Sequence, residues 1–266
     1  MECERIIFGA NILESVKNYK NVYQILETLK NCNIKFIDTA PTYDFGYINK
    51  YIGEHKGYFK VISKISLRKS PRTWVPFQLF PLFKKLFNRK YFRYIFNFIY
   101  TPVEVKSDDF MSHEKSLKKS LKDCNVDYFY TCLFHEDGNK FDGNKNISSY
   151  LKSINEKGLA KNIGISLHGN YTIEEITNLI SFNPWIKSIM LPIESNKYCF
   201  NEIVELVNTN QNINFAVRGF YNAFNEEIFE QIKKFINASK SNSKVVFSTS
   251  KKERIIELVE YLKKIN

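Results

Sequence analysis

The 266-residue chain is predicted to fold as a single (β/α)₈ barrel over residues 1–266, and three features of its sequence favour that fold class. Short apolar runs typical of buried strands alternate eight times with amphipathic runs typical of helices. Eight parallel strands close a barrel, and about 250 residues is the usual length of such a domain. The third feature concerns the alternative, an open doubly wound sheet. Phe8-Gly9-Ala10-Asn11, at the end of the first strand, lacks the glycine-rich phosphate loop of that fold.

The individual elements follow from the spacing of apolar side chains. In chain order the predicted strands are Arg5–Gly9, Ile34–Asp38, Lys60–Lys64, Asp127–Phe134, Asn162–Ser166, Lys187–Leu191, Asn214–Val217 and Lys244–Ser248. After each strand, apolar side chains recur at every third or fourth residue, which is the period of one helix face. The predicted helices are Asn21–Asn31, Gly46–Glu54, Ser112–Asp123, Ile147–Lys157, Thr172–Ser181, Phe200–Asn208, Asn225–Asn237 and Lys251–Lys264. The last is the best defined, because Ile255, Leu258 and Leu262 fall on one apolar face.

Residues 66–109 interrupt this alternation and are predicted to be an insert, because the segment is too long for a loop between a strand and its helix. The net charge of the chain is +11, and the stretch from Ser66 to Lys106 carries +8 of it, with nine Lys or Arg residues against Glu104. Its aromatic residues recur at helical spacing, in the set Phe80, Phe83, Phe87, Tyr91, Tyr94 and Phe98. We therefore expect a basic amphipathic helix.

Two roles are open for this insert. It either packs over the substrate pocket as a lid, or it makes a peripheral contact with a membrane or a protein partner through residues 80–100. Nucleic-acid binding is not expected, because the face opposite the basic side chains is strongly apolar.

The cysteines and the amino terminus indicate the compartment. The five cysteines are odd in number and widely spaced, without a Cys-x-x-Cys pair or a Cys/His cluster. They predict reduced thiols and no metal site. Met1–Ile6 lacks the apolar core of a signal peptide, and no uncharged apolar run reaches the ~18 residues of a membrane span. A cytoplasmic location is expected, with peripheral attachment to a membrane if the insert provides it.

Chemistry in such barrels is located at the carboxyl ends of the strands. The sequence places Asp38, Lys64 and His135 there on strands two, three and four, and Tyr43 in the loop after strand two. A phenol has a pKa of about 10, which a neighbouring ammonium lowers by favouring the phenolate. Asp38 supplies the counter-ion that a buried Lys64 requires. These residues are candidates for general acid catalysis by Tyr43, with His135 binding the substrate oxygen.

The motifs around these residues resemble those of aldo-keto reductases. They are Phe36-Ile37-Asp38-Thr39-Ala40-Pro41-Thr42-Tyr43, the stretch from Ser116–Leu121 through Asp127-Tyr128-Phe129 to His135, and Lys157–Ser166. The resemblance covers nearly the whole chain apart from the insert, and Asp38, Tyr43, Lys64 and His135 match the family's catalytic tetrad in order. It implies that a small-molecule aldehyde, ketone or sugar carbonyl is reduced by hydride transfer from a nicotinamide cofactor.

The resemblance also implies where the phosphate end of the cofactor binds. Family members hold the adenosine phosphate after strand eight, where Ser248, Thr249, Arg254 and Glu257 stand in this chain. Arg254 matches the clamp on a 2′-phosphate, a role that suits a guanidinium. NADP (as NADPH) is therefore expected rather than NAD.

The nicotinamide end is implied to lie against Ser166, Met190 and Arg218. Here the chain departs from the family, in which an Asn and a Gln bind the carboxamide of the nicotinamide. Leu167 replaces the Asn, and Met190 replaces the Gln. The alternative function is therefore a degenerate barrel that acts as a binding, regulatory or membrane-associated protein. The retained tetrad favours the enzyme.

Overall fold

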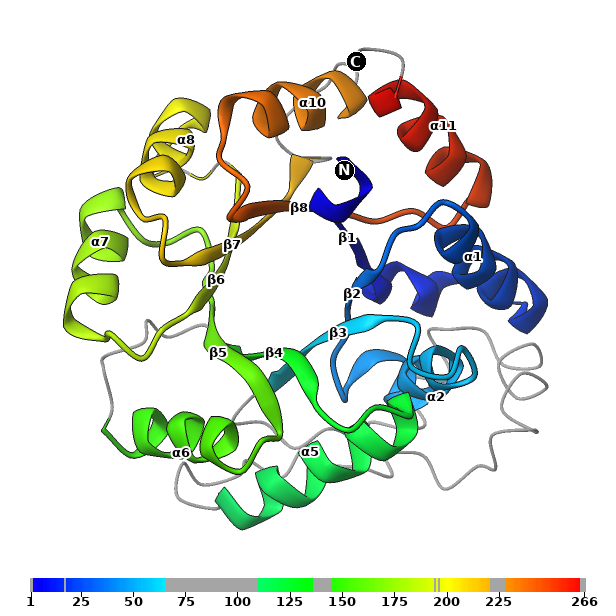
Figure 1. Ribbon diagram of the computed structural model, residues 1–266, viewed down its shortest axis with the longest axis horizontal. Helices are drawn as coiled ribbons and strands as arrows, with labels where there is room; N and C mark the ends of the chain where they lie inside the picture. The colour runs from blue at the N-terminus through cyan, green and yellow to red at the C-terminus, as the bar shows by residue number, and fades with distance from the viewer. Residues whose placement is uncertain are drawn as a thin grey trace.

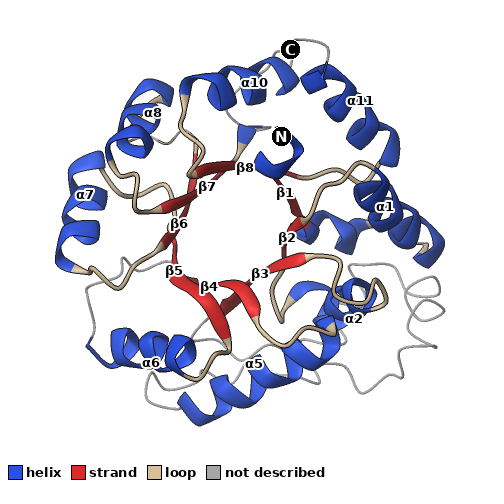
Figure 2. Cartoon of the chain, viewed as in Figure 1, coloured by secondary structure: helices blue, strands red, loops and turns tan. Residues whose placement is uncertain are grey.

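The computed structural model describes residues 2–16, 18–65, 110–135, 145–193, 195, 197–220 and 228–263. The predicted insert over residues 66–109 lies outside the described residues, as do the first residues of the predicted helix Asn225–Asn237. Among the described residues, eight parallel strands close into a barrel in sequence order, as predicted (Figure 1). Figure 2 shows the helices as an outer ring around the strands.

Every predicted strand is present, with ends that shift by at most two residues. The strands are β1 (Ile6–Gly9), β2 (Phe36–Asp38), β3 (Lys60–Ile65), β4 (Phe129–His135), β5 (Ala160–Ser166), β6 (Ser188–Pro192), β7 (Asn214–Arg218) and β8 (Ser243–Phe247). The α-helices are α1 (Tyr19–Asn31), α2 (Tyr47–Gly53), α5 (Phe110–Cys124), α6 (Lys145–Glu156), α7 (Ile173–Phe182), α8 (Phe200–Thr209), α10 (Ile228–Ala238) and α11 (Lys252–Lys263). In the described part of the chain, three short 3₁₀ helices were not predicted: η1 (Glu2–Arg5), η2 (Ala10–Ser15) and η3 (Tyr43–Gly46). One or two turns are too few to show a periodic pattern.

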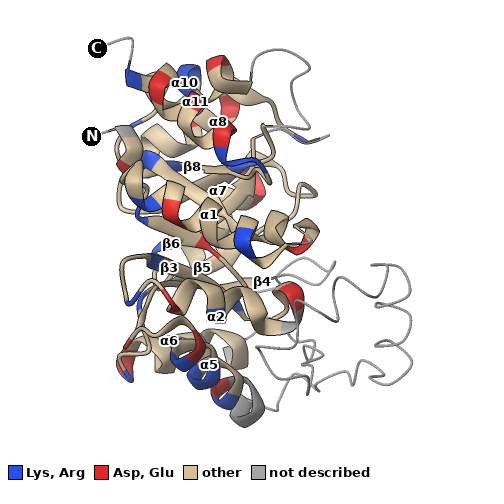
Figure 3. Cartoon of the chain, turned by 90° about the vertical axis from the view of Figure 1, so that its right-hand side faces the viewer, with Lys and Arg blue, Asp and Glu red and all other residues tan. Residues whose placement is uncertain are grey.

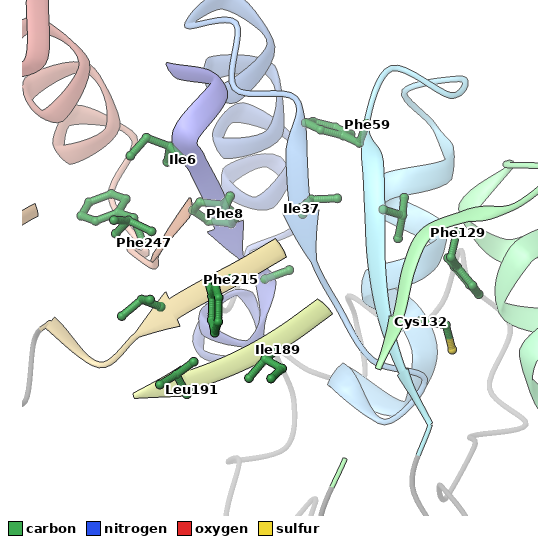
Figure 4. Packing of buried hydrophobic residues seen from close by; sticks show 14 of the residues in the cluster. Ile6, Phe8, Ile37, Phe59, Phe129, Cys132, Ile189, Leu191, Phe215 and Phe247 are labelled. Carbon is green, nitrogen blue, oxygen red and sulfur yellow. The ribbon is translucent and has the colours of Figure 1, made fainter. Parts of the chain in front are cut away.

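The hydrophobic core has two parts, because successive side chains of a strand point to opposite faces. The larger part lies between the strands and the helices, and Figure 4 shows some of its members, including Phe8, Phe215 and Phe247. The smaller part fills the middle of the barrel with Ile7, Phe36, Ile62, Leu133, Met190 and Ala216. The barrel is therefore a packed core, and ligands can reach it only from its two ends.

The register of the strands sets which side chains share the inner face. His135 pairs with Ser166, Ser166 pairs with Met190, and Met190 pairs with Ala216, a member of the inner core. One step further along, Arg218 pairs with Pro192. The polar residues at the carboxyl ends of β4, β5 and β7 thus lie on the inner face, directly above the apolar middle.

The strands β5 and β6 approach each other closely at Gly164. A Cβ atom at this position would lie 1.7 Å from the backbone carbonyl oxygen of Ser188. Because backbone cannot move aside as a side-chain tip can, only glycine fits here.

His55 lies in the turn that follows α2. The side chain is buried, with Nδ1 3.1 Å from Glu27 and the ring stacked on Tyr23. Burial lowers the pKa of His55, and the Glu27 carboxylate only partly offsets this. The histidine is therefore a neutral core residue with no role in a site.

All five cysteines are described, and each is a free thiol. No helix in the described part of the chain has the length and apolarity that crossing a membrane requires.

Candidate active site

Three residues of the predicted tetrad meet at the carboxyl end of the barrel. Asp38 is the last residue of β2, Lys64 lies near the end of β3, and Tyr43 begins η3, the short helix that follows β2. The side chains of Asp38 and Lys64 are buried and form an ion pair. The Nζ atom of Lys64 also donates a hydrogen bond to Oη of Tyr43, at 3.2 Å.

The direction of this hydrogen bond matters for the chemistry. An ammonium has hydrogen-bond donors and no acceptor, so the oxygen of Tyr43 accepts from Lys64. The hydroxyl hydrogen of Tyr43 is not used in this contact and is left for another acceptor. The lysine thus stabilises negative charge on the phenol oxygen without taking its proton.

Charge in this cluster is set by burial and by the ion pair. Burial lowers the pKa of Lys64, but the Asp38 carboxylate and the Tyr43 oxygen raise it further, so the net direction is upward and Lys64 carries its charge. Burial raises the pKa of Asp38, while the charges of Lys64 and Arg218 lower it. We treat the pair as ionised, because the buried ammonium needs this counter-ion.

The expected lowering of the Tyr43 pKa is wrong in direction. Burial raises the pKa of Tyr43, and the opposing effect of Lys64 is smaller. The sequence showed the neighbouring cation but not that burial of the phenol outweighs its effect. Tyr43 therefore holds its proton firmly at neutral pH.

His135, the fourth predicted residue, ends β4, the strand next to the one that carries Lys64. Its ring lies 5.3 Å from the ring of His168, between centroids. His168 follows β5, and no local sequence motif indicates its contact with His135. The register could have revealed it, since His135 pairs with Ser166, two residues before His168.

The residues implied to face the nicotinamide lie together on β5, β6 and β7. The hydroxyl of Ser166 is buried and has no hydrogen-bond partner among the described residues. An unpartnered buried hydroxyl at the barrel mouth fits an amide group, which could donate to it or accept from it. Met190, beside it in register, is fully buried and can offer only a weakly accepting thioether.

Arg218, at the end of β7, is anchored across the mouth. One guanidinium nitrogen donates to the carbonyl oxygen of Leu167, at 3.1 Å. Its positive charge also lowers the pKa of Asp38, which places it within electrostatic range of the ion pair. Arg218 thus adds positive potential to the same end of the barrel.

The residues implied to hold the phosphate end of the cofactor follow β8. Ser248 and Thr249 lie in the loop before α11, where the backbone N–H of Lys251 donates to Oγ1 of Thr249 at 3.2 Å. Arg254 is in the first turn of α11, and its guanidinium lies 4.8 Å from the centroid of the Phe229 ring. The Nε atom of Arg254 is 3.7 Å from Glu257, and both side chains are exposed. An exposed guanidinium beside a helix N-terminus is a favourable place for a phosphate.

The chain resembles known proteins in sequence and in fold. The model of the aldo/keto reductase family matches residues 106–263, which is more than half of the chain. No curated protein sequence matches.

Among solved structures, the chain is similar to a Pseudomonas aeruginosa protein classed as an aldo-keto reductase, with a TM-score of 0.69, 16% identity, and 98% of this chain and 90% of that chain covered. It is also similar to an aldo-keto reductase from Bacillus halodurans in its holo form, with a TM-score of 0.68, 13% identity, and 97% and 86% covered. A third is an aldo-keto reductase from Klebsiella pneumoniae in complex with NADPH, with a TM-score of 0.58, 12% identity, and 97% and 85% covered. At these identities the likeness shows the fold.

Proposed function

Since the chain belongs to the aldo/keto reductase family and is therefore a carbonyl-reducing oxidoreductase, we propose that it uses NADPH to reduce an aldehyde, ketone or sugar carbonyl, with Tyr43 as the general acid. One observation carries the proposal. Lys64 is buried, is held by Asp38, and donates to the oxygen of Tyr43, whose own proton is left free. A purely structural role for Lys64 would not require that it donate to Tyr43 while the hydroxyl proton of Tyr43 stays available.

Each residue of the site has its own role in the proposed reaction. When bound, NADPH supplies the hydride that adds to the carbonyl carbon. As the C=O π bond breaks, its electron pair moves to oxygen, and Tyr43 gives that oxygen its proton to complete the alcohol. Lys64 stabilises the phenolate that remains, and Asp38 holds Lys64 charged and in place. His135 orients the carbonyl oxygen toward Tyr43.

A tightly held proton suits this role. An alkoxide is far more basic than a phenolate, so a phenol with a raised pKa still protonates it once charge develops on oxygen. Before that moment Tyr43 does not lose its proton to water at neutral pH. Burial of the phenol therefore confines proton transfer to the reduction step.

For the cofactor, we assign Ser166 and Arg218 to the nicotinamide end, beside Met190. Ser248, Thr249, Arg254 and Glu257 are assigned to the adenosine phosphate end. The unpartnered hydroxyl of Ser166 supports the first assignment. The exposed guanidinium of Arg254 in the first turn of α11 supports the second and favours NADPH over NADH, because it can pair with a 2′-phosphate.

A fluorescence titration of the full chain with NADPH and with NADH tests the proposal. We expect Arg254→Ala to weaken NADPH binding by about 1.5–3 kcal/mol, the value of a hydrogen bond to a charged group, and to leave NADH binding nearly unchanged. Lys233→Ala, on the neighbouring helix α10, is the matched control and should alter neither. Equal losses for both cofactors in Arg254→Ala would remove this residue from the 2′-phosphate site.

One observation favours the alternative of a binding protein with a degenerate site. Leu167 and Met190 are fully buried and apolar where the family has amide side chains. If NADPH binds but no test aldehyde, ketone or aldose is reduced, the chain is a nucleotide-binding barrel without turnover.

A further inference from the structure

The end of the barrel opposite Tyr43 is lined by polar and cationic side chains. Near the start of the strands, Thr131 pairs with Asn162, and Ser188 pairs with Asn214. Lys60 is the first residue of β3, and Lys244 is the second residue of β8. Barrel interiors are usually filled by branched apolar residues, and the middle of this one is. Buried polar groups at this end of the barrel lower the stability of the fold unless they have hydrogen-bond partners.

A small cavity of about 30 Å³ opens at this end. Its walls include the rings of Phe36 and Tyr130 and the side chains of Thr131, Ser188 and Lys244. This volume holds one or two waters, or one small polyatomic ion whose outer atoms reach toward solvent. The cavity is therefore too small for a metabolite but large enough for a single compact group.

Lys244 lines the cavity, and the ammonium groups of Lys60 and Lys161 lie over the aromatic rings that form its walls. Lys60 Nζ lies 5.1 Å from the centroid of the Phe36 ring and Lys244 Nζ lies 4.8 Å from the same centroid. Lys161 Nζ lies 5.8 Å from the centroid of the Tyr130 ring, and Lys60 is 5.6 Å from that ring. In the described part of the chain, no carboxylate lies within 4.0 Å of any of these three ammonium groups.

Arg5 adds a further positive charge that acts on Lys244. The guanidinium of Arg5 donates hydrogen bonds to carbonyl oxygens at the end of α10, including those of Ile236 and Ser239 at 2.6 and 3.0 Å. These bonds fix the position of its charge. Burial lowers the pKa of Lys244, and the charges of Arg5 and Lys60 lower it further, while Glu4 offsets this less. Like charges therefore act on one another around Lys244, and Glu4 offsets them only in part. Figure 3 shows Lys and Arg positions, in blue, near the N-terminus.

The cavity also contains an unpartnered donor. The hydroxyl of Ser188 is buried, lines the cavity, and has no hydrogen-bond partner among the described residues. Oδ1 of Asn242, also at the cavity, is likewise without a donor, although the amide nitrogen of Asn242 donates to the Ile213 carbonyl oxygen at 2.9 Å. Snorkelling lysines that cover aromatic rings would account for the ammonium groups, but not for these two buried atoms.

We propose that this end of the barrel is a binding site for an oxyanion of the size of phosphate, held by Lys60, Lys161 and Lys244 and by the hydroxyl of Ser188. The ammonium groups supply charge-assisted hydrogen bonds, and the cavity admits one such group. The Oδ1 atom of Asn242 accepts the hydrogen of a protonated phosphate oxygen. The ligand is either free inorganic phosphate or the phosphate end of a larger molecule that remains outside the cavity.

Binding of inorganic phosphate to the full chain, measured by calorimetry at low ionic strength, tests the site. We expect Lys244→Met to weaken binding about tenfold, the effect of one lost hydrogen bond to a charged group, and Lys60→Met to do the same. Lys233→Met is the matched control, since Lys233 also lies over an aromatic ring, 5.9 Å from the centroid of Tyr261, but on the outer helices. It should bind phosphate as the parent chain does.

Ser188→Ala separates binding from folding. Removing an unpartnered buried hydroxyl should leave the unfolding temperature unchanged or raise it, because the desolvated group is gone. The same change should weaken phosphate binding about threefold or more. A structural role alone would not give this combination.

Three outcomes would overturn the proposal. They are the absence of phosphate binding, equal affinity in Lys244→Met, Ser188→Ala and the control, and a loss of binding confined to Arg254→Ala, which would place the phosphate in the cofactor site. A phosphate monoester such as glycerol phosphate then identifies the source. Tighter binding than inorganic phosphate would support a larger ligand, and equal or weaker binding would support free phosphate.

Discussion

At the scale of single residues, the candidate site depends on one buried lysine. Lys64 is the only described group that contacts both Asp38 and Tyr43 through hydrogen bonds. Without it, Asp38 would be a buried carboxylate without its counter-ion, and Tyr43 would lose the cation that stabilises its phenolate. The same side chain therefore affects stability and chemistry.

Lys64→Met should destabilise the fold by about 3–5 kcal/mol, the usual result of removing one partner of a buried ion pair. Adding Asp38→Asn should recover part of the loss, because the uncompensated charge is then removed. Urea unfolding of the two single variants and the double variant measures both effects. A loss below about 1 kcal/mol in Lys64→Met would show that the pair is not buried as described.

His55 gives the fold a dependence on pH. Its pKa is lowered in the folded chain, because burial disfavours the imidazolium and Nε2 has no acceptor among the described residues. The unfolded chain takes up this proton near pH 6.5, the ordinary value for histidine, and the folded chain only at lower pH. The contribution of neutral His55 is therefore fully present above about pH 6.5 and is lost as the pH falls through that value toward the lower folded pKa.

We expect His55→Gln to reduce the slope of unfolding free energy against pH between about pH 7 and pH 5, where the parent chain becomes less stable on acidification. His168→Gln is the control for the loss of a histidine elsewhere. Chemical denaturation at several pH values measures the slopes. An unchanged slope in His55→Gln would show that this residue takes up its proton at the same pH folded and unfolded.

At the scale of elements, the contact of β5 with β6 is the most constrained. Gly164→Ala should cost about 3 kcal/mol or more, because its Cβ atom would overlap the Ser188 backbone and the strands would have to separate. Gly158→Ala is a matched control, since Gly158 has φ +69° but no atom within 4 Å of a built Cβ, and should cost only about 1–2 kcal/mol. Thermal unfolding compares them. Similar losses would mean that the close approach is not what requires glycine.

The order of elements could be predicted because each strand and helix carries its own pattern. The strand that ends in Asp38 and the one that contains Lys64 are short segments rich in apolar residues, and α11 has a full apolar face. The 3₁₀ helix that begins at Tyr43 could not be predicted in this way, although it positions the proposed acid. Four site residues could be chosen from the sequence because barrels bring the carboxyl ends of their strands together.

What the sequence did not reveal are properties that arise between elements. The direction of the Tyr43 pKa depends on burial by neighbours, and the approach of His168 to His135 depends on the register of β4 with β5. The lysines at the other end of the barrel come from β3, β5 and β8, so no local motif marks them. Pairing across strands decides these features, and a single sequence does not display it.

At the scale of the whole molecule, the barrel separates two polar ends by an apolar middle. Asp38 and Lys64 lie at one end, Lys60 and Lys244 at the other, and Ile62 lies between them on the same strand as Lys60 and Lys64. The two ends can therefore bind different ligands without contact between them. The insert over residues 66–109 stays a prediction, with its roles as a lid or as a membrane or protein contact both open.

The central claim is that Tyr43 supplies the proton when a carbonyl is reduced. The most direct measurement is the steady-state oxidation of NADPH by the full chain with an aromatic aldehyde and with an aldose, compared with Tyr43→Phe. We expect turnover to fall by about 10²-fold or more in the variant, because general acid catalysis contributes about 10² to 10⁴, while NADPH affinity measured by fluorescence is nearly unchanged. Unchanged turnover in Tyr43→Phe would contradict the account.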